Sequence, residues 1–197
     1  PSQVKFHSAT YERKPEEDPS IALKAATGLS PADIDIVIMT HLHWDHAGNC
    51  HLFPQAQFYV QMREVVDSIN PIPRFQKTYE SFSIDTVPPW AQQPVKWNFI
   101  DGDCEIIPGI SVVLIPGHSK GIQGVLVDTA NGPYFLGSDS IPLYDNVTKD
   151  GSVIPSTLSL SLEDAYHSCQ KINKLGATII PGHDILVLEH KSYPIEK

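Results

Sequence analysis

Six consecutive positions, HLHWDH at residues 41–46, hold three histidines and one aspartate, one residue after the apolar run DIVIM. The apolar run is continuous rather than alternating, which is typical of a strand with both faces buried. Imidazole and carboxylate groups packed this closely are poor core material, because their burial costs free energy unless each group is paired. They are good ligands for a borderline cation such as zinc. The stretch therefore predicts a metal site at the end of a strand.

Three further residues of the metal-ligand type follow β-rich runs later in the chain. His118 follows SVVLI, Asp139 follows PYFL, and His183 follows ATII. Gly117 and Gly182 precede the two histidines, and we expect them to let the backbone turn sharply there. If these strands lie side by side, their ends meet at one edge and bring the side chains to the histidine cluster. The expected ligands are His41, His43, Asp45, His46, His118, Asp139 and His183.

This set of five histidines and two aspartates suffices for two divalent metal ions that share one carboxylate. Zinc favours imidazole and carboxylate ligands and is the expected ion, and iron, manganese and cobalt also accept them. The chain has no CxxC pair, so we do not expect a thiolate zinc site.

Length, charge and cysteine usage limit the class of protein. The 197 residues suit one domain over the whole chain, with an irregular insertion rich in proline and aromatics at about 71–95. The net charge of −9 argues against nucleic acid as a partner, because phosphate binding needs a basic face. No apolar run of about 18 residues is present to span a membrane. The expected partner is a small-molecule substrate.

The expected location is the cytoplasm. The three cysteines have irregular spacing, which does not indicate a disulfide framework and favours a reducing compartment. The start of the chain, residues 1–20, is polar and lacks the apolar segment of a secretory signal.

Strand candidates occur in both halves of the chain. Residues 57–61 form one, and five short runs separated by turns lie between residues 95 and 138. A strong helical pattern follows at 161–176, with Ser161 as its expected N-cap and Gly176 as its end. Strands in both halves, with helices between some of them, predict a layered α/β fold of two sheets covered by helices.

The motif HxHxDH followed by a separate His, Asp and His resembles the metallo-β-lactamase-fold hydrolases, from residue 35 to about residue 185. The resemblance implies a four-layer αββα sandwich. Within this family the stretches HLHWDHAGN, FYVQMREVVDSINPIP, DGDCEIIPGISVVLIPGHS and PGHD are similar to quorum-quenching N-acyl homoserine lactonases. The resemblance implies one metal on His41, His43 and His118, a second on Asp45, His46 and His183, and Asp139 as the bridge.

Three departures from the lactonase pattern concern the surroundings of the metals. Lactonases read PGHSPGHQS where this chain reads PGHSKGIQG, so Lys120 and Ile122 replace a proline and a histidine that is not a ligand. The tyrosine that lactonases carry three residues after the bridging aspartate is Pro142 here, and Tyr144 is the candidate to replace it. Only 40 residues precede His41, so we expect a chain that lacks the N-terminal strands of the family fold.

The implied reaction is hydrolysis of a lactone or related carboxylic ester by a hydroxide that bridges the two metals. Asp45, beside that hydroxide, is the expected carrier of a proton to the leaving group, and Tyr144 is expected at the substrate carbonyl. Asp184 and Ser138 are candidates to orient the ligands. The expected contacts of an acyl chain are Phe75, Phe82 and Trp90, which are equally consistent with a loop packed onto the domain.

Other reactions on the same ligand set stay open. Thioesters of the glyoxalase II type, β-lactams, phosphodiesters and sulfate esters are all substrates on this fold. A mononuclear iron enzyme that oxygenates sulfur compounds, and a metal-binding protein without turnover, are the alternatives outside hydrolysis. The sequence at residues 58–73 favours a lactone as the substrate, whereas the stretch GHSKGIQG counts against a standard lactonase.

Overall fold

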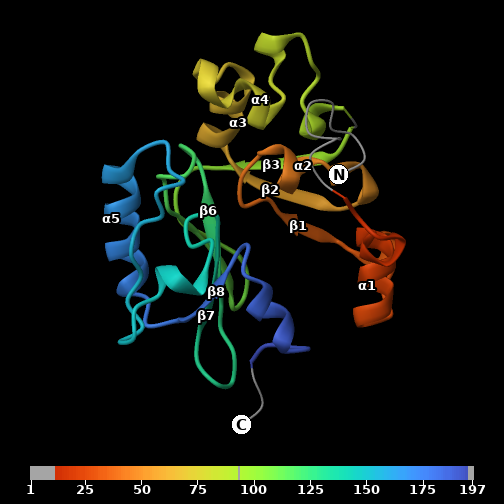
Figure 1. Cartoon of the computed structure of the whole chain (residues 1–197). Helices are drawn as coiled ribbons and strands as arrows, with labels where there is room; N and C mark the ends of the chain where they lie inside the picture. The colour runs from red at the N-terminus through yellow and green to blue at the C-terminus, as the bar shows by residue number, and fades with distance from the viewer. Residues whose placement is uncertain (1–11, 93, 195–197) are drawn as a thin grey trace. The chain divides into compact units, whose positions relative to one another are not determined.

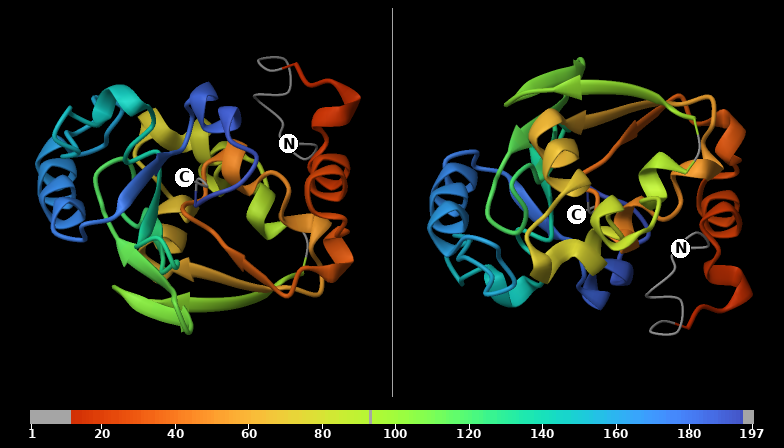
Figure 2. Two further views of the ribbon diagram at one scale, coloured as in Figure 1. Left: turned by 90° about the horizontal axis from the view of Figure 1, so that it is seen from below. Right: turned by 90° about the horizontal axis from the view of Figure 1, so that it is seen from above.

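The computed structural model describes residues 12–92 and 94–194, which divide into two compact units. The N-terminal unit ends at Ile100, and the C-terminal unit starts at Asp101. Each unit has its own β-sheet and its own helices (Figures 1 and 2). Most of the polar stretch at the start of the chain, residues 1–11, lies outside the described residues. The expectation of one domain over residues 1–197 stays a prediction.

The N-terminal unit contains a parallel three-stranded sheet in the order β1-β2-β3. The strands are β1 (Ile36–Ile38), β2 (Gln57–Gln61) and β3 (Lys96–Ile100). Phe58, fully buried at the centre of this sheet, pairs with Trp97 of β3, and their rings lie 5.2 Å apart. The prediction that the first strand is buried on both faces is wrong, because its three residues are only half-buried. The reason is that β1 is an edge strand of the sheet in the described part of the chain.

Short helices precede and connect these strands. The α-helices of the unit are α1 (Pro19–Thr27), α2 (Trp44–Ala47), α3 (Met62–Ile69) and α4 (Gln76–Tyr79). The 3-10 turns are η1 (Pro15–Glu17), η2 (Pro31–Asp33), η3 (Cys50–Leu52), η4 (Pro73–Phe75), η5 (Phe82–Ile84) and η6 (Pro89–Ala91). The segment expected to be irregular, 71–95, thus consists mainly of single helical turns joined by extended residues.

Helix α3 faces the interior with its polar side. Glu64 and Ser68 are fully buried, whereas Met62 and Val66 are 44% and 62% exposed. Residues one turn apart share a face of a helix, so the buried polar pair and the exposed apolar pair form two opposed stripes. Val65 is buried in the core beside them, so the buried face of α3 is mixed, and its polar members require polar partners.

The C-terminal unit contains a five-stranded sheet in the order β4-β5-β6-β7-β8. Pairing is antiparallel from β4 to β7, and β8 is parallel to β7. The strands are β4 (Cys104–Ile107), β5 (Ile110–Leu114), β6 (Gln123–Val127), β7 (Tyr134–Ser138) and β8 (Thr178–Pro181). The helical elements are η7 (Tyr144–Asn146), α5 (Leu162–Asn173) and η8 (Ile185–Glu189).

Helix α5 covers one face of the five-stranded sheet (Figure 2). The predicted N-cap is confirmed, because the Ser161 side chain accepts a hydrogen bond from the Asp164 N–H at 3.2 Å. Cys169 and Ile172 of the helix pack in one buried cluster with Phe135 and other apolar residues of the sheet. No helix in the described part of the chain combines the length and the hydropathy needed to cross a bilayer.

Candidate metal centre

The end of β1 delivers the histidine cluster of the N-terminal unit. The Met39 N–H donates to the Tyr59 carbonyl at 2.9 Å, which extends the β1–β2 pairing by one residue. His43 then begins the short helix α2 as its N-cap residue. Its carbonyl accepts hydrogen bonds from the N–H groups of His46 (3.1 Å) and Ala47 (2.8 Å). The strand, the cap and the helix together fix the backbone of the whole HLHWDH stretch.

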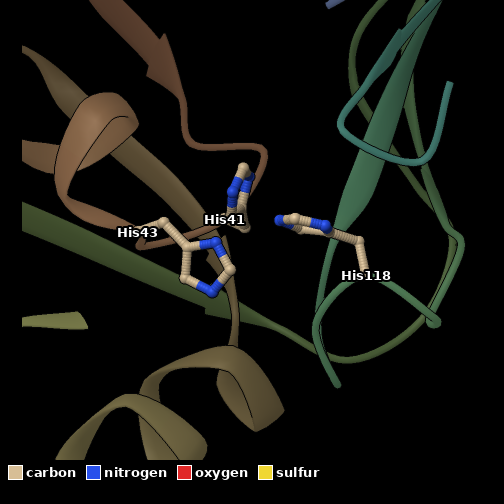
Figure 3. Close-up of side chains that lie close together, drawn as sticks. All are labelled: His41, His43 and His118. Atoms are coloured by element: carbon tan, nitrogen blue, oxygen red, sulfur yellow. The ribbon is translucent and has the colours of Figure 1, made fainter. Parts of the chain in front are cut away.

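The imidazoles of this stretch gather in one place. His41 and His43 are buried, and their ring centroids lie 4.6 Å apart, nearly perpendicular (Figure 3). The His46 ring lies 4.1 Å from that of His41, and the Asp45 carboxylate lies 3.5 Å from His46 Nε2. His41 Nδ1 shares a hydrogen bond with the Thr40 hydroxyl at 3.2 Å. In the tautomer in which Nδ1–H donates, Nε2 carries the lone pair that a cation requires.

In the C-terminal unit two predicted ligands, His118 and His183, face the carboxylate of the third, Asp139. Asp139 directs Oδ2 toward His118 Nε2 at 3.4 Å and Oδ1 toward His183 Nε2 at 3.1 Å. His118, labelled in Figure 3, hydrogen-bonds the Leu158 carbonyl through Nδ1, which leaves Nε2 as its ligand atom. A carboxylate with one oxygen toward each of two imidazoles is the arrangement that a ligand shared by two cations needs.

Close approach of two backbone segments brings Asp139 and His183 together. A Cβ added to Gly182 would lie 2.6 Å from the carbonyl carbon of Ser138, so only glycine permits the approach. Ser138 itself has a φ of 47°, at the irregular end of the β7–β8 pairing. The chain bends at Gly182 as expected, but its φ is not in the left-handed region, so the need for a glycine there comes from the lack of space.

Gly117, which precedes His118, combines both reasons for a glycine. Its φ is 148°, and an added Cβ would lie 2.6 Å from Cα of Ala165 in α5. The Gly117 carbonyl also accepts hydrogen bonds from the N–H groups of Leu160 (2.7 Å) and Ser161 (3.0 Å). The loop that carries His118 is therefore fastened to the start of α5.

Asp184 links the segment after Asp139 to the segment that holds His183. Its carboxylate accepts hydrogen bonds from the N–H groups of Tyr144 (2.8 Å) and Leu186 (2.9 Å). The His183 N–H also donates to the carbonyl of Pro142 at 2.9 Å. Ser138, the other candidate to orient the ligands, donates its hydroxyl to Asp139 Oδ1 at 3.4 Å.

Tyr144, the candidate for a catalytic tyrosine, is half-buried in η7. Burial first, and then the neighbouring Tyr193 hydroxyl, raise its pKa to about 12. The phenol is therefore protonated at neutral pH and acts as a hydrogen-bond donor.

The three predicted acyl-chain residues occupy two places in the N-terminal unit. Phe75 stacks on His43, with ring centroids 6.2 Å apart and ring planes 5° apart. Phe82 and Trp90 contact each other at 6.4 Å, and Trp90 contacts Trp97 of β3 at 6.0 Å. Phe75 thus adjoins a predicted ligand, whereas Phe82 and Trp90 extend the aromatic packing at β3.

Two buried residues near the histidine cluster were not among the predicted site residues. The Glu64 carboxylate accepts hydrogen bonds from the Leu42 N–H (3.1 Å) and the Tyr79 hydroxyl (2.9 Å). The Tyr79 ring lies edge-on to His43, with centroids 4.5 Å apart. No sequence signal points to Glu64, because a glutamate in a helix is ordinarily a surface residue.

A family model described as the metallo-beta-lactamase superfamily matches residues 8–183. The chain belongs to this superfamily. The match includes all seven predicted ligands, and the resemblance found in the sequence is confirmed.

Curated relatives within the metallo-beta-lactamase superfamily carry hydrolase names. A probable metallo-hydrolase of Methanocaldococcus jannaschii is 32% identical over 163 residues, covering 83% of this chain. The N-acyl homoserine lactonase AttM of Azorhizobium caulinodans is 30% identical over 180 residues, covering 86% of this chain. The chain spans 63% and 65% of the lengths of these two relatives.

Solved structures of lactonases share the fold. A Bacillus thuringiensis AiiA mutant with N-decanoyl-L-homoserine bound is similar with a TM-score of 0.72 at 24% identity, over 93% of this chain and 69% of that one. AidC, a dizinc quorum-quenching lactonase in complex with a product, has a TM-score of 0.66 at 22% identity, over 89% of this chain and 65% of that one. The predicted fold class, an α/β fold of the metallo-β-lactamase type, is confirmed.

Proposed function

We propose that this member of the superfamily is a metal-dependent hydrolase that opens a lactone of the N-acyl homoserine lactone type, or a related carboxylic ester. The observation that carries the proposal is the Asp139 carboxylate, which has one oxygen directed to each of two histidine Nε2 atoms. The HLHWDH stretch supplies the remaining ligands from its own fixed loop.

In this proposal the seven predicted ligands hold two cations. The assignment is His41, His43 and His118 for one cation, Asp45, His46 and His183 for the other, and Asp139 for both. Within the N-terminal unit, ligand atoms of His41 and His43 lie within 4.8 Å of each other. Imidazole and carboxylate ligands favour zinc, and iron, manganese or cobalt would fit the same donors.

Two cations bound at such ligands lower the pKa of water from about 15.7 to about 7 and polarise a carbonyl oxygen. The protein then has to move a proton from the attacking water to the leaving alkoxide. Asp45 is the residue that we assign to this transfer, because its carboxylate is exposed beside the ligand His46. The cytoplasm, where thiols stay reduced, is the compartment that we propose for the reaction.

Replacing Tyr144 by phenylalanine should lower kcat for lactone opening by about 100-fold, the usual cost of one donor to a developing oxyanion. The reason is that the phenol of Tyr144 is a hydrogen-bond donor, and in this proposal it donates to the substrate carbonyl oxygen. The substitution keeps the backbone bond to Asp184, so metal content should not change. Steady-state kinetics measure the effect, with Tyr166→Phe, an exposed tyrosine of α5, as the matched control.

An unchanged kcat in the Tyr144→Phe protein would remove this residue from the mechanism. It would then be a structural partner of Asp184 and Tyr193.

The lactone is favoured as substrate by the names of the relatives and by one feature of the N-terminal unit. AttM and AiiA are N-acyl homoserine lactonases, at 30% and 26% identity. Phe75 lies against the ligand His43, which puts an apolar surface beside the metal ligands. We assign Phe75, together with Phe82 and Trp90, to the acyl chain of the substrate.

The first experiment is metal analysis by mass spectrometry on the purified protein, with lactone opening followed by pH-stat on the same sample. We expect about two divalent metals per chain, acid release on addition of an N-acyl homoserine lactone, and loss of activity on chelation. Addition of zinc to the chelated protein should restore the activity.

Two other results would change the assignment. Two metals without lactone opening would keep the metal centre and direct the assay to thioesters of the glyoxalase II type. One iron per chain with uptake of oxygen would contradict hydrolysis and favour the oxygenase.

A further inference from the structure

The buried polar face of α3 ends at the backbone between two predicted metal ligands. Glu64, in the first turn of α3, is fully buried. Its Oε1 accepts a hydrogen bond from the N–H of Leu42, the residue between His41 and His43. Burial of a carboxylate costs free energy unless it is hydrogen-bonded, and this hydrogen bond offsets part of that cost.

The same carboxylate oxygen also fixes an aromatic neighbour of a ligand. The Tyr79 hydroxyl donates to Glu64 Oε1 at 2.9 Å, and Tyr79 is 1% exposed. Its ring contacts the His43 imidazole edge-on, at a centroid distance of 4.5 Å and an angle of 68°. Glu64 therefore acts on the ligand loop by two routes, through the Leu42 backbone and through the ring that rests on His43.

The Leu42 side chain anchors the loop from its other side. It is fully buried and belongs to the core cluster of the N-terminal unit, together with Phe58 and Val60 of β2. With the N–H held by Glu64 and the side chain held by the core, Leu42 has little freedom to rotate. The two histidines that flank it share this restraint, because their Cα atoms are one peptide unit away.

We propose that Glu64 is a positioning residue that, with Tyr79, presets His41 and His43 in the orientation that the first metal requires. This rests on the proposed function in one respect, namely that these two histidines bind a metal. Groups that orient the ligands of a metal, without touching it, typically contribute about 10- to 100-fold to its affinity.

The test compares zinc affinity, by competition with a chromophoric chelator, in the wild type and four variants. Glu64→Leu removes the acceptor, and we expect zinc affinity to fall about 10- to 100-fold. Glu64→Gln keeps an oxygen acceptor and should recover most of that loss. Tyr79→Phe keeps the ring on His43 but deletes the hydroxyl, and should lie between the two.

Ser68→Ala is the matched control. Ser68 is fully buried on the same face of α3, but its hydroxyl donates to the Val65 carbonyl within the helix. Its replacement removes a buried hydrogen bond without touching the ligand loop, so zinc affinity should stay at the wild-type value. Thermal unfolding of the metal-free proteins reports the cost to the fold separately, and the absorption spectrum of the Co²⁺ form reports ligand geometry.

The proposal is supported if Glu64→Leu loses affinity and shifts the Co²⁺ spectrum, Glu64→Gln recovers most of the affinity, and Ser68→Ala changes neither. It is overturned if Glu64→Leu and Tyr79→Phe bind zinc like the wild type, or if Ser68→Ala loses affinity to the same extent. Should Glu64→Leu fail to fold, Tyr79→Phe decides by the same criteria. A wild type that binds no metal would instead overturn the proposed function, and this inference with it.

Discussion

Replacement of Asp139 by asparagine is expected to lower kcat/KM for lactone opening by more than about 100-fold, beyond the range typical of residues that only orient ligands. Asparagine keeps the shape of the side chain but has no charge, and its amide nitrogen cannot bind a cation. One of the two imidazoles that now face a carboxylate oxygen would then face an NH₂ group. Metal analysis should show a fall from about two ions toward one, alongside the steady-state kinetics.

Asp145→Asn is the control for the Asp139 variant. Asp145 is an exposed carboxylate in η7, six residues further along the same segment, and it is not among the predicted ligands. Its replacement removes the same charge from the C-terminal unit and should leave metal content and kcat/KM unchanged. A full complement of metal and activity in Asp139→Asn would rule out a shared carboxylate and require a different ligand scheme.

The candidate metal ligands could be proposed from the sequence because their signal is local. Histidines at positions 41, 43 and 46 follow an apolar strand, and His118 and His183 each follow a strand and a glycine. Such residues stand out by type and spacing. In the structure His41 and His43 follow β1, His46 lies in the short helix α2, and His118 and His183 follow β5 and β8. The family model matches the stretch that contains all of them.

The residues that hold the histidine loop in place could not be predicted from the sequence in the same way. The sequence of α3 divides into two opposed faces, but the periodicity does not tell that the face with Glu64 is the buried one. Glu64 is buried because its partners, the Leu42 N–H and the Tyr79 hydroxyl, lie 22 and 15 residues away along the chain. A hydrogen bond over that separation depends on the tertiary fold, so a single sequence gives no sign of it.

The glycines show the same limit. Both PGH motifs were expected to need a glycine for a turn, which holds for Gly117 with its φ of 148°. The chain also bends at Gly182, but the glycine is required there by the space against Ser138, 44 residues earlier, and only the pairing of β7 with β8 reveals this contact. The bend was therefore predictable from the sequence, whereas the close approach was not.

In the Gly182→Ala variant we expect the metal affinity to fall by more than about 10-fold. We expect its free energy of unfolding to fall by about 1–3 kcal/mol. The added Cβ would lie 2.6–2.8 Å from three backbone atoms of Ser138, which cannot move aside as a flexible side chain would. Relief of the clash has to separate the segments that carry Asp139 and His183. Their oxygen–nitrogen distance of 3.1 Å would open, and with it the geometry for a shared cation. Zinc competition and chemical denaturation measure the two effects.

Gly151→Ala separates the loss of the site from the general cost of a lost glycine. Gly151 has a φ of 85° with nothing within 4 Å of an added Cβ, so alanine there is strained by about 1–2 kcal/mol without a clash. It should lower stability to a similar extent and leave zinc affinity intact. If both variants kept wild-type affinity, the approach of Gly182 to Ser138 would be a feature of folding alone. If Gly182→Ala alone lost affinity, the close approach would be the device by which the parallel β7–β8 pair holds Asp139 and His183 at the distance that a shared metal needs.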